Sequence, residues 1–148
     1  MTRRHHFKGR TASGKRSPLE DLHKAQFEKA GVKVAFEPFG ITYIVPPKKY
    51  KPDWLVLHNG ILIESKGWFQ SSDRSKLKLI KQQYPALDLR IVFAKPHTKI
   101  GKKSETTYAM WADRMGIPWA EKNIPKSWLR EKPNALRLAA LKAARGEA

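Results

Sequence analysis

The sequence predicts a mixed α/β fold in which a sheet is flanked by helices. Segments with helix-capping signals alternate with short β-branched runs along the 148-residue chain. Hydrophobic residues make up 41% of the chain, and five Trp and six Phe supply bulky side chains for a core. These observations favour a folded protein of about one domain over a disordered polycation.

The first elements in chain order are predicted to be a helix and two strands. Ser17 can cap a helix, a proline follows it, and Glu20 completes the pattern of a capping box. A helix is therefore expected over 18–30, where the next glycine ends it. Alternating and β-branched residues then predict strands over 32–36 and 41–45.

A hairpin is the central element of the predicted sheet. Asn59-Gly60 is a strong signal for a tight two-residue turn, and apolar runs flank it on both sides. Strands are therefore predicted over 53–58 and 61–66. The prolines before them make 46–52 a stiff basic connector, because proline is unsuited to a central strand.

The remaining predicted elements alternate between helix and strand, with serines at the helix starts. They are a helix from Ser71 and Ser72 to Tyr84, a buried strand over 89–93 and a helix from Ser104 to Met115. Residues from Asn134 onward are rich in Ala and Leu with interspersed Arg and Lys, and can form a final amphipathic helix.

The expected organisation is a disordered basic arm over 1–16, a folded domain over 17–132 and a basic, Ala-rich tail over 133–148. Within the domain, 17–45 and 53–132 are joined by the Pro-rich connector. No apolar run reaches the length needed to span a bilayer, so we expect a soluble, intracellular protein without a membrane partner.

The charge of the chain indicates a nucleic-acid partner. Thirty Lys and Arg against thirteen Asp and Glu leave a net charge of +17, which attracts a polyanion strongly. Charge alone is equally compatible with an architectural protein that only binds. The chain has no cysteine, which excludes disulfides and thiolate metal sites and leaves oxygen ligands or histidine for any metal.

The hairpin also carries the residues that point to chemistry. A two-residue turn would pair Leu55 with Glu64 and Asp53 with Lys66, so that Asp53, Glu64 and Lys66 share one face, with the two carboxylates roughly 7 Å apart at Cβ. Carboxylates at this spacing can share a divalent cation. The competing explanation is an ion pair between Lys66 and Asp53 with Glu64 solvated. The shared face and the positive charge together favour a metal-dependent nuclease.

Other charged residues have structural explanations beside the functional ones. The capping box explains Glu20 completely from local sequence. Six basic residues are candidates for phosphate contact, although solvated surface positions explain them equally well. They are Arg74, Lys78, Lys81, Lys95, His97 and Lys99.

Residues spread over about 16–128 match a known pattern in the same order. They include Tyr50 with Pro52-Asp53, Asn59-Gly60-Ile61, Glu64 with Lys66-Gly67, Asp73-Arg74, Arg90-Ile91-Val92-Phe93 and Ile124-Pro125 with Trp128. In these residues the sequence resembles the phage endonuclease I family of Holliday-junction resolvases, within the PD-(D/E)xK nuclease group. So many ordered matches are far more specific than the short nuclease motif alone.

The resemblance implies a restriction-endonuclease-like mixed sheet flanked by helices, in an intertwined, segment-swapped homodimer. It implies that Asp53, Glu64, the carbonyl of Ser65 and Glu20 ligate Mg²⁺, with Mn²⁺ as an alternative. Lys66 would orient or activate the attacking water. Glu20 of one subunit would complete the site of the other.

The function implied is that of a structure-selective endonuclease in DNA recombination, acting in the host cytoplasm if a phage encodes it. It would resolve branched DNA such as Holliday junctions by metal-dependent phosphodiester hydrolysis, leaving 5′ phosphates. Two alternatives stay open at this point. One is a non-catalytic, architectural nucleic-acid-binding protein, and the other is a related nuclease with a different DNA preference.

Overall fold

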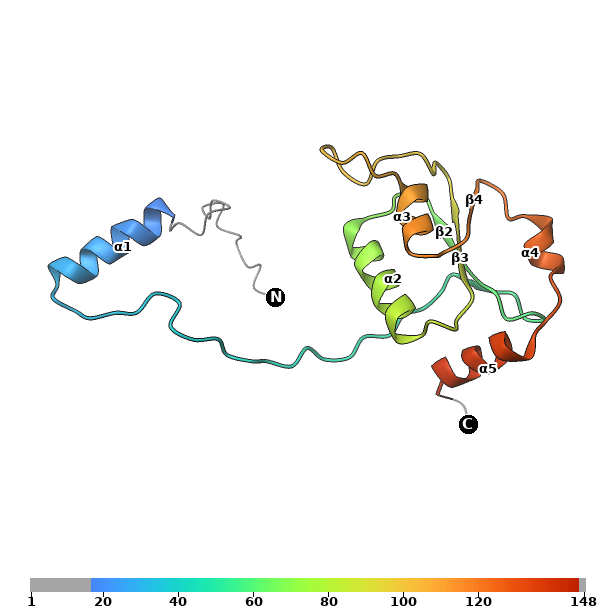
Figure 1. Ribbon diagram of the computed structural model, residues 1–148, viewed down its shortest axis with the longest axis horizontal. Helices are drawn as coiled ribbons and strands as arrows, with labels where there is room; N and C mark the ends of the chain where they lie inside the picture. Colours follow the sequence, from blue (N-terminus) through green and yellow to red (C-terminus); the bar gives the residue numbers. More distant parts are fainter. Residues whose placement is uncertain (1–16, 147–148) are drawn as a thin grey trace. The chain divides into compact units, whose positions relative to one another are not determined.

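The computed structural model describes residues 17–146, so the predicted arm over 1–16 and the last two residues lie outside the described residues. The chain divides into two compact units, Met1–Pro46 and Pro47–Ala148. Figure 1 shows a helix in the described part of the first unit and a sheet flanked by helices in the second.

The N-terminal unit contains helix α1, Pro18–Lys29. The backbone N–H of Ser17 donates to Glu20 Oε2 at 2.6 Å, and the N–H of Glu20 donates to Ser17 Oγ at 3.2 Å. These two bonds satisfy donors that the first helical turn cannot pair internally. The helix ends just before Gly31, which adopts a positive φ of 67°. The predicted helix and its capping box are therefore confirmed.

The two strands predicted over 32–36 and 41–45 are wrong for this chain. Among the described residues of the N-terminal unit, no segment is in a strand. Alternation of side chains predicts which face of a strand can be buried, but a strand also needs a neighbour to pair with. Apolar side chains here are instead exposed, with Phe39, Ile41 and Ile44 at 76%, 80% and 90%.

The C-terminal unit is built on a mixed sheet, as predicted. Its strands within the described residues are β1 (Trp54–Leu55), β2 (Leu62–Lys66), β3 (Leu89–Phe93) and β4 (Trp119–Glu121), adjacent in that order. β1 pairs antiparallel with β2, whereas β3 lies parallel to both β2 and β4. β3, predicted over the same residues, is buried along its whole length.

Helices cover both faces of this sheet (Figure 1). They are α2 (Ser71–Gln83), α3 (Tyr108–Arg114), α4 (Lys126–Arg130) and α5 (Ala135–Ala144). On one face, Leu77 of α2 and Ala112 of α3 pack in one core cluster with Phe93. On the other face, Trp128 of α4 packs against Ile63. The sheet is thus packed against a hydrophobic core cluster on each of its two faces.

Two predicted helix starts need correction. α2 begins at Ser71 itself, and the N–H of the preceding Gln70 donates to Asp73 Oδ2 at 3.1 Å. α3 begins at Tyr108 behind Thr107, while Ser104 accepts a bond from Thr106 within a loop. In each case a nearby residue supplies the cap that was assigned to a serine. β4 and α4 were not predicted, because three and five residues are too short to show a period.

The register of the hairpin also differs from the prediction. Trp54 pairs with Ile63 and Leu55 with Leu62, which is two positions away from the expected register. The loop is longer than a two-residue turn, because the N–H of Val56 donates to the carbonyl of Ile61 at 2.9 Å across residues 57–60. A shift by two residues keeps every side chain on its face. Extended by one position, the observed register sets Asp53 directly opposite Glu64.

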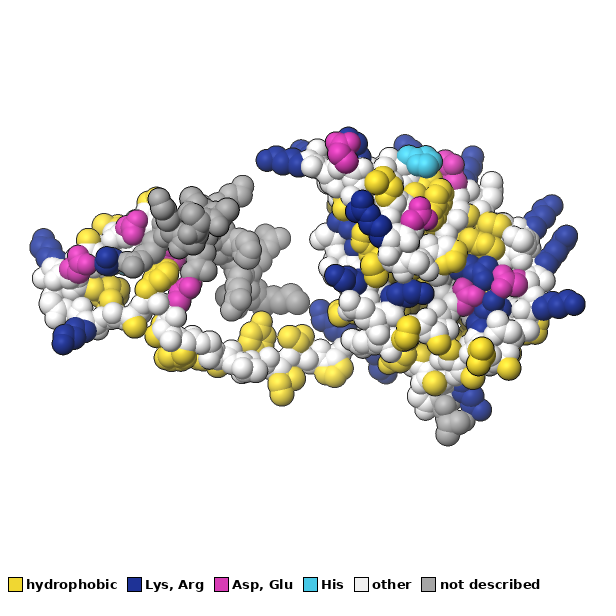
Figure 2. All heavy atoms as spheres, in the orientation of Figure 1, with side chains coloured by type: hydrophobic (Ala, Val, Ile, Leu, Met, Phe, Trp, Pro, Cys, Tyr) yellow, Lys and Arg dark blue, Asp and Glu magenta, His cyan; other side chains and the backbone are white. Residues whose placement is uncertain are grey.

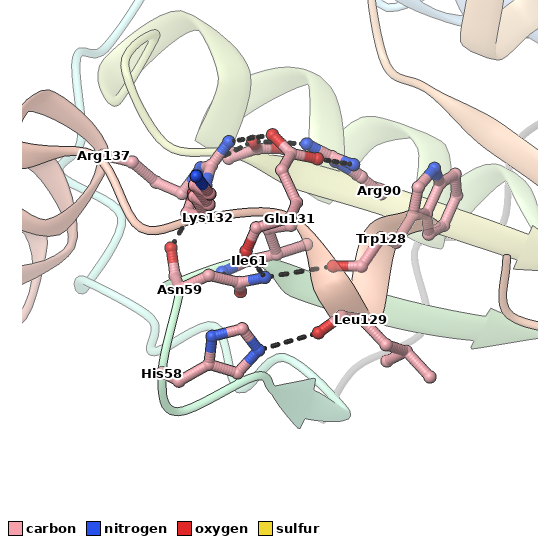
Figure 3. A network of polar contacts seen from close by, with 10 residues as sticks. His58, Asn59, Ile61, Arg90, Trp128, Leu129, Glu131, Lys132 and Arg137 are labelled. Carbon is pink, nitrogen blue, oxygen red and sulfur yellow. Dashed lines mark hydrogen bonds and ion pairs between the residues drawn. The ribbon is translucent and has the colours of Figure 1, made fainter. Parts of the chain in front are cut away.

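Asn59 explains why the loop is wider. Its side chain is fully buried, and Nδ2 donates to the carbonyls of Trp128 and Glu131, both at 3.0 Å (Figure 3). Its Oδ1 accepts from the N–H of Ile61 at 3.1 Å. Asn59 therefore anchors the C-terminal segment instead of forming the tip of a tight turn.

Two buried arginines and two partly exposed carboxylates continue this network (Figure 3). Arg137 of α5 bonds to Asp88 at 2.8 Å, to Glu131, and to the carbonyl of Asn59 at 3.3 Å. Arg90 of β3 makes two bonds of 2.8 Å to Asp88 and an ion pair of 2.9 Å to Glu131. We call these four residues, Asp88, Arg90, Glu131 and Arg137, the anchoring cluster.

The charges of the anchoring cluster compensate one another. Burial on its own would raise the pKa of Asp88, but the hydrogen bonds and charges of Arg90 and Arg137 outweigh it and hold that pKa below its ordinary value. Hydrogen bonds from Arg90 and Arg137 likewise lower the pKa of Glu131. Both carboxylates are therefore held in their charged form.

The C-terminal segment forms the helix predicted for it. α5 begins after Asn134, whose Oδ1 accepts from the N–H of Arg137 at 2.7 Å. Over residues 17–146, none of the helices is long and apolar enough to cross a membrane.

Candidate active site

The structure brings Asp53, Glu64 and Lys66 together at one pocket. Asp53 directly precedes β1, and the other two residues lie on one face of β2. The pocket is lined by Tyr50, Lys51, Asp53, Glu64, Lys66, Asp73, Lys76 and Leu77. Because β1 begins at Trp54, the backbone opposite the end of β2 is not in the ladder, and this leaves the polar end of the hairpin open.

Glu64 is the most buried carboxylate of the pocket, with 2% of the residue exposed. One of its oxygens accepts a short hydrogen bond from the hydroxyl of Tyr50. Burial raises the pKa of Glu64, and the nearby charge of Asp53 raises it further, whereas Tyr50 and Lys66 lower it without reversing the shift. The site therefore holds a carboxylate whose charge is only partly compensated.

Lys66 lies between two carboxylates. Its Nζ is 3.6 Å from Glu64 Oε2 and 3.4 Å from Asp73 Oδ1. The bridge from Lys66 to Asp53, which was the competing explanation of the motif, is not the arrangement found. Only the contact with Asp73 is a hydrogen bond, so the ammonium keeps donors for a further acceptor in the pocket.

Ser65 of β2 bonds to two consecutive residues, Asp53 and Trp54. Its N–H donates to Asp53 Oδ2 at 2.9 Å, and its hydroxyl accepts from Trp54 Nε1 at 3.0 Å. Within a strand, the N–H and C=O of one residue point to the same side. The carbonyl of Ser65 is therefore directed to the side of β2 on which Asp53 lies.

Glu20 lies in the N-terminal unit, where its side chain closes the capping box of α1. In residues 17–146 no three His, Asp or Glu side chains are grouped closely enough to hold a metal ion. Asp53, Glu64 and Asp73 all line the pocket, but Asp73 is bonded to Lys66 and to the N–H of Gln70.

The basic residues predicted to contact phosphate lie outside the lining of this pocket, which instead contains Lys51 and Lys76. On α2, Arg74 Nη1 donates to the carbonyl of Phe69 at 2.6 Å, and the guanidinium lies 5.9 Å from the centre of that ring. Lys78 is exposed, while Lys81 lines a separate pocket near α5. Arg74 therefore has a structural role within its own helix and loop.

The three candidates beyond β3 are exposed. Lys95 and Lys99 extend from the surface, and Lys99 pairs with Glu105 at 3.2 Å. His97 packs edge-on against Trp119, with ring centres 6.1 Å apart. These residues lie on the segment that leaves the carboxyl end of β3, next to the end of β2 that carries Lys66.

Sequence reasoning placed neither Tyr50 nor Asp73 in the site. Tyr50 lies in the Pro-rich connector, where no periodicity indicates which way a side chain points. Asp73 carries a capping role at the start of α2, and that role gives no sign of its neighbour Lys66. Both residues belong to the matched pattern, which is the signal that could have identified them.

Comparison with known proteins identifies the family. The family model of phage endonuclease I matches residues 1–148. The chain belongs to the phage endonuclease I family.

Relatives within the phage endonuclease I family are similar over most of their length. Endonuclease I of Escherichia phage T7 is 40% identical over 134 residues, which is 89% of each chain. Endodeoxyribonuclease 1 of Enterobacteria phage T3 is 40% identical over 133 residues, covering 88% of this chain and 87% of the relative.

Proposed function

We propose that this protein is an endodeoxyribonuclease that cuts branched DNA, such as Holliday junctions, by metal-dependent hydrolysis of phosphodiester bonds. The observation that carries the proposal is the pocket in which Asp53, Glu64 and Lys66 meet. Two relatives that share 40% of their residues with it bear the names of an endonuclease and an endodeoxyribonuclease. The net charge of +17 suits a polyanionic substrate.

The donor set of the pocket fits a hard divalent cation such as Mg²⁺ or Mn²⁺. Asp53 and Glu64 offer carboxylate oxygens, and the carbonyl of Ser65 is directed to the same side of the strand. The partly compensated charge of Glu64 favours binding of a cation over an uncharged ligand. When bound, the cation would supply Lewis-acid stabilisation of the negative charge that develops on the phosphate.

Lys66 would serve the reaction by donating a hydrogen bond. Its ammonium forms ion pairs with Glu64 and Asp73. An N–H group that is not bonded to these carboxylates can orient the attacking water or a phosphate oxygen. Attack of water at phosphorus with departure of the 3′ oxygen leaves a 5′ phosphate. We propose recognition of the DNA through backbone shape and charge, because branch points differ from duplexes in geometry.

An intertwined homodimer would complete the site. Residues of the N-terminal unit expose apolar side chains, among them Phe39, Ile41 and Ile44, which a second copy of the chain could cover. We propose that Glu20 of one subunit joins Asp53 and Glu64 of the other, with the connector 46–52 carrying the chain across. Among residues 17–146 no three such side chains are grouped closely enough to hold a metal ion, which supports a ligand set completed by a second subunit.

The nuclease proposal is tested with a four-way DNA junction and magnesium. Wild-type protein should cut the junction and should stop when EDTA is added. Glu64→Gln should abolish cutting and keep junction binding. The control is the same change at an exposed residue of β4, Glu121→Gln, which should leave both cutting and binding unchanged. Metal-independent binding without cutting would instead indicate an architectural protein. Competition with mismatched, single-stranded and blunt-ended DNA would identify a different substrate preference.

Mixing two inactive variants tests the shared site. Glu20→Gln keeps the capping hydrogen bond and removes the charge, so it should be inactive without loss of α1. If Glu20 acts in the partner's site, a heterodimer of Glu20→Gln and Glu64→Gln chains contains one intact site and regains nicking. If Glu20 acts within its own chain, the mixture stays inactive. Full activity of Glu20→Gln alone would limit Glu20 to helix capping.

A further inference from the structure

A projecting loop follows β3, and its backbone is internally bonded. The N–H of Tyr108 donates to the carbonyl of Thr98 and the N–H of Ile100 to that of Thr106, both at 2.9 Å. Lys99 and Thr107 form an antiparallel bridge. At the tip, the N–H of Ser104 donates to the carbonyl of Gly101 at 3.1 Å. We call residues 98–107 the finger, and Figure 1 shows it extending away from the sheet.

The segment that leads from β3 into the finger is bonded to β2. The N–H of Ala94, at the end of β3, donates to the carbonyl of Lys66 at 2.9 Å. Tyr108, where the finger rejoins the fold, is buried and meets Phe69 edge-on with ring centres 5.6 Å apart. Phe69 follows Lys66 by three positions and also packs against Phe93. The finger therefore joins the fold beside the aromatic group of Phe69, Phe93 and Tyr108, at the end of the sheet where β2 carries Lys66.

The finger carries an excess of positive charge. Lys99, Lys102 and Lys103 are all exposed. Figure 2, in the same orientation as Figure 1, shows basic side chains at the projecting tip. Glu105 is the one acidic residue within 98–107; its side chain is 91% exposed and pairs with Lys99 at 3.2 Å. Lys102 and Lys103 are left as the charges at the tip.

We propose that the finger binds the phosphate backbone of a DNA arm next to the cutting site, with Lys102 and Lys103 contacting phosphates. This inference rests on the proposed function, because it takes DNA as the substrate. Lysine is a compact point charge that contacts phosphate without reading bases, which suits a site that recognises backbone position. Glu105 weakens the contact by pairing with Lys99 and by repelling the phosphates.

The proposal is tested by the salt dependence of junction binding in EDTA. The double variant Lys102→Ala with Lys103→Ala should bind more weakly, and the slope of log Kd against log salt should fall by about 2, since each phosphate contact contributes roughly 0.9. The control removes two positive charges elsewhere, by Lys126→Ala with Arg130→Ala, two residues of α4 that are also exposed. Equal slopes for the two double variants would overturn the proposal, because only the overall charge would then matter.

Glu105→Gln provides an opposite and independent test. Removing this charge should tighten junction binding by about two- to fivefold at low salt, and the gain should disappear at high salt. Weaker or unchanged binding would contradict the proposal.

Cutting by the wild type separates the nuclease hypothesis from the finger hypothesis. A protein that binds but does not cut refutes the nuclease and leaves the finger measurable, whereas a protein that cuts with an unimportant finger refutes only the finger.

Discussion

The two polar clusters of the C-terminal unit lie near opposite ends of β2 and differ in how their charges are balanced. In the anchoring cluster, two arginines face two carboxylates, and the pKa of both carboxylates is lowered. In the pocket with Asp53 and Lys66, Glu64 is more deeply buried than Asp88, and this burial raises its pKa. In the anchoring cluster, the charges of the carboxylates are balanced by arginines of the same chain. In the pocket, the charge of Glu64 is only partly balanced, which favours binding of a cation. Complete compensation favours stability, and incomplete compensation favours binding.

The largest effect that this comparison predicts is on removal of Arg137. Arg137→Ala leaves Asp88 and Glu131 with one arginine and leaves the carbonyl of Asn59 without this donor. The free energy of unfolding should fall by about 3–5 kcal/mol, as for other broken buried ion pairs. Urea denaturation followed by circular dichroism measures this, with the exposed Arg130→Ala as control. A loss similar to that of the control would show that the cluster does not hold α5.

Neutralising one carboxylate in each cluster should have opposite consequences. Asp88→Asn loses charged hydrogen bonds to Arg90 and Arg137, so stability should fall by about 1.5–3 kcal/mol. Glu64→Gln removes a carboxylate that burial disfavours, so stability in EDTA should stay equal or rise. Junction cutting should fall on the order of 100- to 1000-fold in Glu64→Gln. A Glu64→Gln protein that is clearly less stable would mean that Glu64 is a structural residue.

The pH dependence of stability should separate the clusters further. A carboxylate whose native pKa is lowered contributes stability above its unfolded pKa, and the contribution is lost as pH falls through the native value. The difference in unfolding free energy between wild type and Asp88→Asn should therefore be full above the ordinary value of 3.8 and shrink below it. Urea titrations at pH 7, 5, 4 and 3 measure the difference. A constant difference over this range would rule out the charge of Asp88 as the cause.

The smallest predicted effect is that of Tyr50→Phe. This change removes the hydroxyl that donates to Glu64 and keeps the ring that packs beside the core. Stability should change by less than about 1.5 kcal/mol. Cutting should decline by less than in Glu64→Gln, because Glu64 keeps its burial, its charge and its contact with Lys66. Matching losses in the two variants would assign Tyr50 a direct part in the reaction.

The parts of the fold that the sequence could predict are those specified by local signals. The capping box of α1 and the continuous apolar run of β3 are examples, because each depends on neighbouring residues alone. Segments 32–36 and 41–45 could not be judged in this way, since a strand requires a partner that local sequence does not reveal.

The same distinction holds for the site. The grouping of Asp53, Glu64 and Lys66 follows from side-chain alternation, which survived an error of two positions in register. The contacts of Tyr50 with Glu64 and of Asp73 with Lys66 could not be predicted in this way. They depend on how the Pro-rich connector and the first turn of α2 pack against β2. The width of the hairpin loop depends on Asn59, whose amide bonds to residues about 70 positions later in the chain.

The bond between Asn59 and Arg137 joins residues that are 78 positions apart. During synthesis, Asp88 and Arg90 leave the ribosome well before Arg137, so Asp88 lacks one of its two arginines until Arg137 has been made. Contacts between distant residues form late because they close a long loop. The unit that contains β2 can thus complete its packing only after Arg137 has been made. A translation product that stops before α5 would keep the bonds from Asn59 to Trp128 and Glu131 but lack the bond from Arg137 to the carbonyl of Asn59.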